Sequence, residues 1–315
     1  MVSWVCVSPG VKCKSAITQA RAVNGFTLLA MLVVPWLVFD RAAEAGAPSD
    51  GRKQGGSLMI CGGGRLPEEI RDTFIELAGG REARIVVIPT AHALADAPGV
   101  EEWALAPWQT KGVASLTRLH TRSREEANNP EFCRPLSDAT GVWIGGGKQT
   151  AITSAYLGTE VERQLKALLD RGGVIAGTSA GAAVMTQVMI ASGRSEAVVS
   201  QGFDFLPGAV VDQHFLKRRR ARRLLGVVAS NRDLIGFGID EGTTLVFTPS
   251  TGRLRVLGDS CVLACTADAS TGSPRFERLK AGDETDLLVL RRPDRVIASP
   301  IDLEELVTTR DSMRK

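Results

Sequence analysis

The feature that most constrains the fold is an alternation of short apolar runs with longer amphipathic segments along the body of the chain. The strand-like apolar runs are residues 57–61, 84–89, 115–120, 141–144, 173–176, 209–211 and 234–239. Helical periodicity falls between most of them, at residues 67–78, 101–112, 149–155, 159–171, 180–190 and 215–230. Alternating strands and helices predict a mostly parallel sheet covered by helices on both faces. We therefore expect a three-layer α/β fold.

The pattern changes after residue 240, where strand-like segments follow one another without helices between them. These segments are residues 243–248, 253–257, 260–266 and 286–290. Consecutive strands predict antiparallel hairpins, which we expect to extend one edge of the sheet. The length of 315 residues, with 44% hydrophobic and 23% charged residues, suits a globular protein with a sizeable core. We expect residues 51–315 to form a single α/β domain.

The first 50 residues have a different character. Lys12, Lys14 and Arg21 precede an apolar run at residues 26–39, and small residues follow at 42–47. The run is shorter than the roughly 17–25 residues that a membrane span needs. The order of basic, apolar and small residues predicts a secretory signal, so we expect export to the periplasm or the medium, with membrane contact only through this leader. Two alternatives stay open: a misassigned start codon, which would leave the protein in the cytoplasm, and an uncleaved anchor.

One short turn carries the clearest chemical signal. The apolar run 174–176 leads into Gly177-Thr-Ser-Ala-Gly181, a Gly-x-Ser-x-Gly pattern, and a helical segment follows. The glycines let the chain reverse without a Cβ clash, which leaves the hydroxyl of Ser179 exposed at the tip. The amides and the dipole at the start of a helix favour negative charge there. The pattern predicts a serine nucleophile, although an ordinary glycine-rich turn would read the same way.

A serine nucleophile needs a base, and the chain has three histidines: His92, His120 and His214. His120 ends an alternating, strand-like run. His92 follows a strand that runs into a loop, and His214 follows the apolar run 209–211. Because catalytic groups in open α/β sheets gather at the carboxyl ends of strands, we favour His214 over His92 as the base.

Several motifs, taken in order, resemble the cyanophycinase family of serine peptidases, whose more distant relatives are the aspartyl dipeptidases of the peptidase E type. The matching segments are Ile88-Pro-Thr90, Gly145-Gly-Gly-Lys-Gln149, Gly177-Thr-Ser-Ala-Gly-Ala182, residues 212–225 and Gly238-Ile-Asp-Glu-Gly242. The resemblance extends from about residue 57 to residue 290. It implies a class I glutamine-amidotransferase-like (flavodoxin-like) fold, which is often homodimeric.

The resemblance also implies a Ser–His–Glu arrangement. Ser179 matches the nucleophile and His214 the base, while Glu196, in the Glu-Ala context of the family, fits the acid. The carboxylate would hold the imidazole tautomer and stabilise the imidazolium that forms. Asp212 and Asp240 are the alternatives for this role.

The oxyanion of such a reaction is expected to be held by backbone amides. One would be the amide of Ala180, and the other, by analogy with the family, that of Gly146 or Gly147. Gln149 is retained from the family pattern, whereas Lys148 stands where the family often has aspartate or asparagine. This exchange places a cation near the expected site.

The basic run 217–223 lies within the expected helix 215–230. Helical spacing of 100° per residue places four arginines on one arc opposite the apolar side chains: Arg218, Arg219, Arg222 and Arg223. The same spacing turns Arg220 and Lys217 toward the apolar side. Because an arginine is almost never buried without a partner, Arg220 requires an anion, either a protein carboxylate or one supplied by a substrate.

The family pattern matches Arg218, Arg220 and Arg223, and the resemblance implies that they help to bind a substrate made of aspartate and arginine. Gln149, Asp212 and Gln213 would lie beside them. We expect no nucleic-acid partner, because aromatic residues make up only 5% of the chain, the net charge is +3 and no recognised reader motif accompanies the run.

The implied activity is hydrolysis of cyanophycin, a poly-aspartate with arginine on each side chain. A serine-type exopeptidase would release β-Asp-Arg dipeptides through an acyl-enzyme on Ser179. Two alternatives stay open: an aspartyl or isoaspartyl dipeptidase that acts on small peptides, and a non-catalytic binding protein that keeps the fold. No cofactor or metal is expected, because the cysteines after the leader show no ligand spacing.

Overall fold

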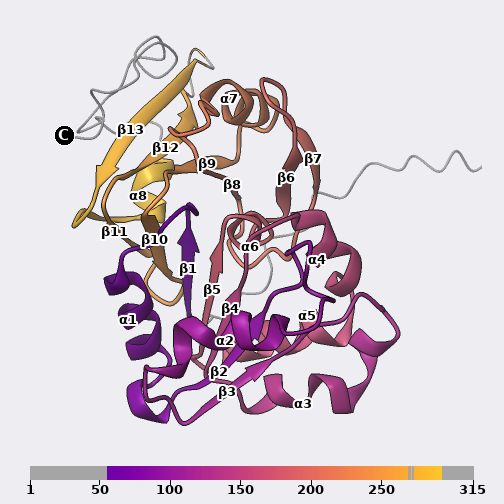
Figure 1. Cartoon of the computed structure of the whole chain (residues 1–315). Helices are drawn as coiled ribbons and strands as arrows, with labels where there is room; N and C mark the ends of the chain where they lie inside the picture. Colours follow the sequence, from indigo (N-terminus) through magenta and orange to yellow (C-terminus); the bar gives the residue numbers. More distant parts are fainter. Residues whose placement is uncertain (1–54, 269–270, 272, 293–315) are drawn as a thin grey trace, which may run out of the picture. The chain divides into compact units, whose positions relative to one another are not determined.

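The computed structural model describes residues 55–268, 271 and 273–292, all within one compact unit that spans Gly51–Lys315. The leader expected at residues 1–50 lies outside the described residues. The largest element is an eight-stranded sheet in the order β14-β11-β10-β1-β5-β4-β2-β3 (Figure 1). Its strands are β1 (Ser57–Cys61), β2 (Arg84–Ile88), β3 (Ser115–Arg118), β4 (Gly141–Ile144), β5 (Val174–Thr178), β10 (Thr243–Thr248), β11 (Arg253–Gly258) and β14 (Glu284–Asp286).

Strands β1 to β5 run parallel, and their carboxyl ends meet at one edge. In the register of the sheet, Cys61 of β1 lies opposite Thr178 of β5, and Ile144 of β4 lies opposite Gly177. The segments that follow these strands therefore begin side by side. This is the edge at which open α/β sheets place their functional groups.

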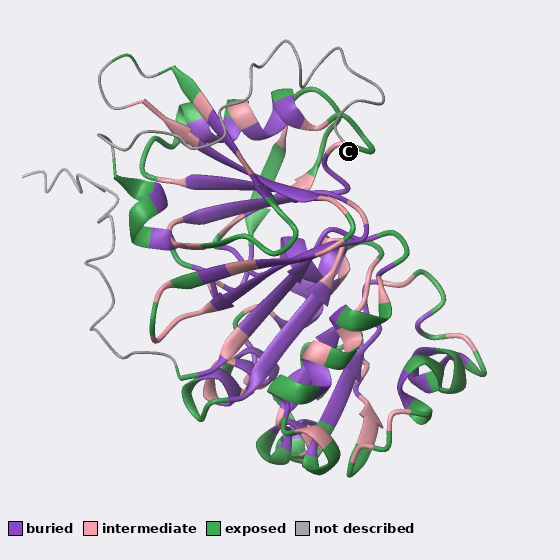
Figure 2. Ribbon diagram, turned by 90° about the vertical axis from the view of Figure 1, so that its left-hand side faces the viewer, coloured by how far each residue is buried: buried purple, intermediate pink, exposed green. Residues whose placement is uncertain are grey.

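Helices cover both faces of the parallel strands, as the alternation in the sequence predicts. Successive side chains of β1 enter different apolar clusters: Leu58 and Ile60 lie in one, Met59 and Cys61 in the other. The strands are buried and the outer sides of the helices are exposed (Figure 2). The helices are α1 (Glu68–Leu77), α2 (Val100–Gln109), α3 (Pro130–Asp138), α4 (Gln149–Tyr156) and α5 (Glu160–Asp170), with 3-10 turns η1 (Gly80–Glu82) and η2 (Glu126–Asn128).

A second sheet replaces part of the single sheet expected from the sequence. It has the order β13-β12-β9-β8, with β8 (Ala209–Gln213), β9 (Ile235–Ile239), β12 (Cys261–Ala267) and β13 (Pro274–Lys280), and α7 (Ala221–Ser230) connects β8 to β9. We expected β8 and β9 in the main sheet, and this was wrong. The place beside β1 is taken by β10, which pairs with β1 in the antiparallel sense.

The strands after residue 240 divide between the two sheets. β10, β11 and β14 extend the main sheet, which agrees with the expected antiparallel extension, whereas β12 and β13 join the second sheet. The expected strand at 286–290 is wrong, because α8 (Leu287–Arg291) begins there. The carboxylate of Asp286 caps this helix by accepting a hydrogen bond from the amide of Leu288 at 2.7 Å.

Two expected helices are shorter than the sequence indicates. The helix expected at 180–190 ends early: α6 is Ala180–Ala183, and a hairpin of β6 (Val188–Ser192) and β7 (Val198–Gln201) follows. The carbonyls of Val184 and Met185 accept hydrogen bonds from backbone amides of the segment that follows the hairpin. These carbonyls are therefore not available to continue the helix. The helix expected at 215–230 begins only at Ala221. Within the described residues, no helix is long and apolar enough to cross a membrane.

Candidate active site

The elbow at the end of β5 holds Ser179 in a strained conformation. Its φ of 54° and ψ of −108° lie outside the regions that ordinary residues prefer. Glycine is required on both sides of it. A Cβ on Gly177 would lie 2.3 Å from the carbonyl oxygen of Gly181, and a Cβ on Gly181 would lie 2.2 Å from that of Ile144. The amide of Ser179 donates to the carbonyl of Cys61 at 3.1 Å, which fixes the elbow against β1.

His214 follows β8 and reaches the serine from the second sheet. Its Nε2 lies 2.8 Å from the Ser179 Oγ. Its amide donates to the carbonyl of Gly62 at 2.7 Å, and its φ of 52° is left-handed. The ring packs against the backbone of Gly63, where an added Cβ would lie 2.5 Å from the imidazole Cε1. A glycine at position 63 therefore makes room for the imidazole.

The carboxylate that orients His214 is that of Glu241. Its Oε1 lies 2.7 Å from the His214 Nδ1, on the side of the ring opposite the serine. The expectation that Glu196 would take this place was wrong. Glu196 is exposed in the turn between β6 and β7. Glu241 follows β9, and since β9 lies beside β8, its side chain reaches the end of β8.

The two aspartates considered as alternatives make other contacts. The carboxylate of Asp240 accepts hydrogen bonds from the Lys217 amide at 3.1 Å and the Ser260 hydroxyl at 3.0 Å. Asp212 is fully buried and pairs with Arg223. The sequence signal for Glu241 was present in Gly238-Ile-Asp-Glu-Gly242, one of the motifs that carry the family resemblance.

The surroundings of His214 favour its neutral form. Burial lowers the pKa of the imidazole below its ordinary value near 6.5, and the positive charge of Arg218 lowers it further, while the hydrogen bond that Nδ1 donates to the Glu241 carboxylate opposes both effects. A neutral imidazole has a free lone pair with which to accept the proton of Ser179. The site therefore suits general base catalysis at neutral pH.

The basic run forms a turn followed by a helix, and its arginines divide into two groups. Arg223 is buried. Its Nε donates to Asp212 Oδ2 at 2.6 Å, and its Nη1 donates to the Gly193 carbonyl at 2.6 Å. Its expected place on the arc opposite the apolar side chains was therefore wrong. Lys217, expected on the apolar side, is exposed. The other three arginines that helical spacing placed opposite the apolar side chains are exposed: Arg218, Arg219 and Arg222.

Arg220 has the protein anion that its expected burial required. Its Nη1 lies 3.3 Å from Asp212 Oδ1 and donates to the Gln213 carbonyl at 2.6 Å. The side-chain oxygen of Gln213 accepts from the same nitrogen. Burial lowers the pKa of this guanidinium to about 10, which still leaves it charged at neutral pH. Asp212 and Gln213 therefore position Arg220 at the end of the non-helical segment that leads from His214 to α7.

The loop after β4 lies against the serine. A Cβ on Gly146 would lie 3.3 Å from the Ser179 Cβ, and a Cβ on Gly147 would lie 2.0 Å from the Ala91 carbonyl oxygen. Glycine is required at position 147, where the φ of 140° and the nearby carbonyl exclude a side chain, and at position 146 a Cβ would be tightly packed against the serine. Ala180 is the first residue of α6, where backbone amides have no acceptor within the helix. The loop after β4 and the first residue of α6 therefore both adjoin Ser179.

The side chains of Gln149 and Lys148 follow the same loop, but one is held by hydrogen bonds and the other is exposed. The amide nitrogen of Gln149 donates to the carbonyls of Ile190 and Ala191, both at 2.8 Å, and so ties α4 to β6. The side chain of Lys148 is exposed. The structure gives Gln149 a role in positioning the hairpin that follows α6.

The other two histidines have partners of their own. His120 lies between the Thr90 hydroxyl and the Asp96 carboxylate, each 2.9 Å from a ring nitrogen. His92 stacks on Trp103 with ring centroids 4.5 Å apart. The preference for His214 as the partner of the serine agrees with this geometry.

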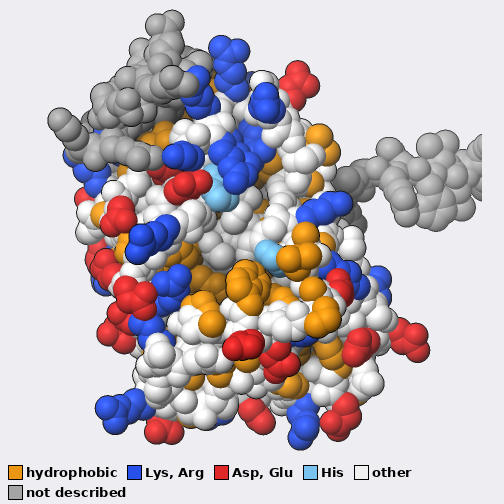
Figure 3. Space-filling view, in the orientation of Figure 1, with side chains coloured by type: hydrophobic (Ala, Val, Ile, Leu, Met, Phe, Trp, Pro, Cys, Tyr) orange, Lys and Arg blue, Asp and Glu red, His pale blue; other side chains and the backbone are white. Residues whose placement is uncertain are grey.

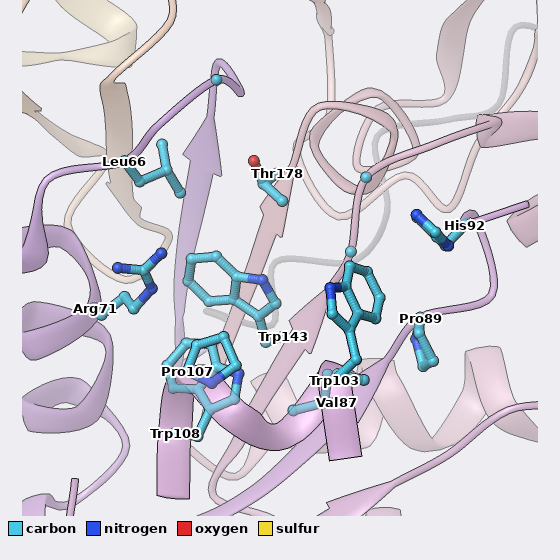
Figure 4. A pocket seen from close by; sticks show the side chains of 14 residues that line it. Leu66, Arg71, Val87, Pro89, His92, Trp103, Pro107, Trp108, Trp143 and Thr178 are labelled. Atoms are coloured by element: carbon cyan, nitrogen blue, oxygen red, sulfur yellow. The ribbon is translucent and has the colours of Figure 1, made fainter. Parts of the chain in front are cut away.

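A pocket of about 400 Å³ opens beside the elbow. Gly146 and Thr178 form its border with the serine, and aromatic side chains from α2 and β4 form its walls (Figure 4). Basic side chains gather on one side of the hollow on this face of the molecule, and hydrophobic side chains gather on the other (Figure 3). The site therefore has a charged half and an apolar half.

A hydroxyl on a strained elbow, an imidazole and a carboxylate in hydrogen-bonded series define a serine hydrolase on an α/β scaffold. Among the described residues no group of histidine, cysteine and acidic side chains could hold a metal ion. The chain belongs to peptidase family S51, whose family model matches residues 58–255. It is accordingly a serine-type peptidase.

Its relatives agree with this assignment. The chain is 35% identical over 239 residues to a cyanophycinase of Synechococcus elongatus, a match that covers 72% of this chain and 73% of the relative. It is 36% identical over 218 residues to a cyanophycinase of Trichormus variabilis, covering 65% and 72% of the two chains. Among solved structures it is similar to a peptidase from an acI-B1 Actinobacterium, with a TM-score of 0.59, 25% identity, and coverage of 75% of this chain and 98% of that one.

Proposed function

We propose that the protein hydrolyses cyanophycin and releases β-Asp-Arg dipeptides. The observation that carries the proposal is the hydrogen-bonded series Ser179–His214–Glu241 in a member of family S51 whose relatives include cyanophycinases. The binding-protein alternative required a displaced Glu196 or a displaced His214. Glu196 is displaced, but Glu241 takes its place on His214, and the 2.8 Å contact between Nε2 and Oγ speaks against this alternative.

The proposed reaction is acyl transfer to water. The Ser179 Oγ attacks the scissile carbonyl carbon while the His214 Nε2 accepts its proton, and Glu241 stabilises the imidazolium through Nδ1. The tetrahedral intermediate collapses, and His214 returns the proton to the leaving amine. Water, deprotonated by His214, then attacks the acyl-enzyme ester and regenerates the free serine. His214 begins each attack in the neutral form that its lowered pKa favours, and the imidazolium formed in the attack is the acid that protonates the leaving group.

The oxyanion of this intermediate would be held by backbone amides. We assign this part to the Ala180 amide and to an amide of the Gly146-Gly147 loop, because α6 begins directly after Ser179 and the loop packs close to the Ser179 Cβ. Loss of one such donor typically costs about 10²–10³ in rate. The steric need for glycine at position 147 and the close approach of Gly146 to Ser179 support the placement of this loop in the reaction.

The charged half of the site would bind the aspartate and arginine groups of the polymer. Arg218 is exposed and close enough to His214 to lower its pKa, so its guanidinium is available to a substrate carboxylate. Arg220 is held in place by Asp212 and Gln213. Arg223 is occupied by Asp212 and Gly193, so we assign it a positioning part.

The proposal is tested by offering the full chain insoluble cyanophycin and, in parallel, short peptides with an N-terminal aspartate, linked through the α- or the β-carboxyl group. Released products are identified by mass, with Ser179→Ala as the control. Release of β-Asp-Arg from the polymer by the parent alone is the expected result. Cleavage of the short peptides without polymer hydrolysis would instead establish an aspartyl or isoaspartyl dipeptidase.

Three further properties belong to the same proposal. The basic, apolar and small-residue order at 1–50 supports export by a signal peptide, which cell fractionation of an expressing strain tests. The motifs that resemble the family support a class I glutamine-amidotransferase-like fold and a homodimer. Sedimentation of the purified protein distinguishes a dimer from a monomer.

A further inference from the structure

All of the tryptophans in the described part of the chain line one pocket. They are Trp103 and Trp108 of α2 and Trp143 of β4, while the other two of the five, Trp4 and Trp36, lie outside the described residues. Figure 4 shows the three indoles around the same space, with Pro107 beside them. The charged groups of cyanophycin do not account for this concentration of apolar side chains next to Ser179.

The floor of the pocket is preformed. Trp108 and Trp143 pack edge to face with ring centroids 4.8 Å apart, and each lies 5.3 Å from the ring of Phe74 beneath them. Such pairs fix ring orientation in addition to burying area. The exposed fractions of Trp108 and Trp143 are only 2% and 7%. A ligand would therefore meet rigid aromatic surface.

One wall is open to solvent. Trp103 is 55% exposed and stacks on His92, which also lines the pocket. A large exposed indole at the mouth of an apolar pocket leaves hydrophobic area in water that an apolar ligand would cover. Trp103 is therefore the side chain with the most area available to an occupant.

The charges of the lining argue against a cationic occupant. No carboxylate is among the described residues that line the pocket, and Arg71 brings a positive charge to it. The guanidinium of Arg71 is paired with Glu68 at 2.9 Å on α1. A guanidinium entering this pocket would lose water without gaining a counter-charge, whereas a neutral hydrocarbon group would gain from leaving water.

The pocket lies next to the reacting groups. Gly146 lines it, and a Cβ at that position would lie 3.9 Å from the Ser179 Oγ. Gly64 also lines it, and a Cβ there would lie 2.9 Å from the Glu241 Oε2. A side chain in the pocket would thus belong to a residue adjoining the scissile bond.

We infer that this pocket binds an uncharged aromatic or branched aliphatic side chain of a peptide substrate, so that the enzyme accepts apolar peptides in addition to the arginine-bearing polymer. The catalytic part of the inference rests on the proposed function, whereas the binding part does not. Pocket volume, aromatic walls and the absence of a lining carboxylate all favour this class of group.

The binding part is tested with a matched pair of probes, N-acetylphenylalanine amide and N-acetylarginine amide. In the full chain with Trp4→Phe and Trp36→Phe, all tryptophan emission arises from the pocket, and its change with probe concentration gives Kd. We expect the phenylalanine probe to bind at least about tenfold more tightly than the arginine probe. Trp103→Ala should weaken the binding of the phenylalanine probe about three- to tenfold, and Trp103→Phe should restore this binding. The control is Leu288→Ala, which removes an exposed leucine from α8.

Equal or tighter binding of the arginine probe, or an unchanged Kd in Trp103→Ala, would overturn the inference. For the substrate part, the phenylalanine probe should raise the KM for cyanophycin without changing kcat. If the probe binds but leaves the KM for cyanophycin unchanged, the pocket does not hold a substrate residue next to the scissile bond. This result would overturn the substrate part of the inference. If the protein does not hydrolyse cyanophycin, the proposed function fails, but the emission of the pocket tryptophans still reports whether the pocket binds the probe.

Discussion

Two non-glycine residues of the site, Ser179 and His214, have left-handed φ values, 54° and 52°. Such conformations are costly and persist where the surroundings fix them. Here the amide of each donates to a carbonyl of the segment at the end of β1, Ser179 to Cys61 and His214 to Gly62. The same short segment therefore fixes both partners of the 2.8 Å contact.

The sequence identified these two residues but not the third. Ser179 carries a local signal, the flanking glycines, and His214 was favoured among three histidines by its place at a strand end. Glu241 becomes a partner of His214 only because β8 and β9 are neighbours, which local sequence does not specify. The residues around Glu196 by themselves favour a solvated loop glutamate, and only the family resemblance assigned it the role of the acid.

Glu241→Gln should lower kcat for cyanophycin hydrolysis by about 10²–10⁴, because the amide no longer stabilises the imidazolium or fixes its tautomer. Glu196→Gln should leave kcat within about twofold of the parent. Initial rates of dipeptide release compare the two. A severe loss in Glu196→Gln with little effect in Glu241→Gln would reverse the assignment.

Arg218→Gln should raise the pKa of His214, because the cation lowers it in the parent. The enzyme is active when His214 is neutral, so activity falls as the pH drops through this pKa. The acid limb of kcat/KM should therefore move to higher pH. Arg222→Gln, an exposed arginine on α7, should leave the limb in place. A limb that stays unshifted in Arg218→Gln contradicts this electrostatic account.

At the scale of elements, the segment between β8 and α7 shows how tertiary contacts override helical periodicity. Residues 215–230 have helical spacing, but left-handed φ values at His214 and Arg219 stop a helix from forming before Ala221. The break lets His214 turn to the serine and Arg220 turn to Asp212. Helical spacing placed the apolar side of α7 correctly from Ala221 onward, but it misplaced Arg223.

Arg223→Met should lower the free energy of unfolding by about 3–5 kcal/mol, because it leaves the carboxylate of Asp212 buried with one fewer partner. Urea denaturation gives the value. The double variant Asp212→Asn with Arg223→Met should recover part of the loss, and Arg222→Met is the exposed control. A loss of less than about 1 kcal/mol in Arg223→Met would show that the Asp212–Arg223 ion pair contributes little to the free energy of unfolding.

At the scale of the molecule, the sequence predicted the five parallel strands and the helices on both faces, because each strand is a short apolar run between amphipathic segments. It did not predict the division into two sheets. Whether β8 or β10 lies beside β1 depends on pairing between distant segments, and both strands are almost wholly buried, so burial does not distinguish them. The site is built where the two sheets meet, with Ser179 from one and His214 from the other.

The cysteines of the described part should be unreactive in the folded protein. Cys61, Cys133, Cys261 and Cys265 are free and buried, and burial raises the pKa of the Cys61 and Cys265 thiols to about 12. A thiol reagent should therefore label four more cysteines in urea than in buffer at pH 8. Rapid labelling of Cys61 or Cys265 without urea would contradict the burial of these strands.

The central claim is that His214 and Glu241 activate Ser179 as a nucleophile. The most direct measurement is labelling with a fluorophosphonate, followed by mass mapping of the modified peptide and comparison of rates between the parent and Glu241→Gln. We predict a single adduct on Ser179, none in Ser179→Ala, and labelling at least about 10²-fold slower in Glu241→Gln. An adduct on another residue, or equal labelling rates in the parent and Glu241→Gln, would contradict the account.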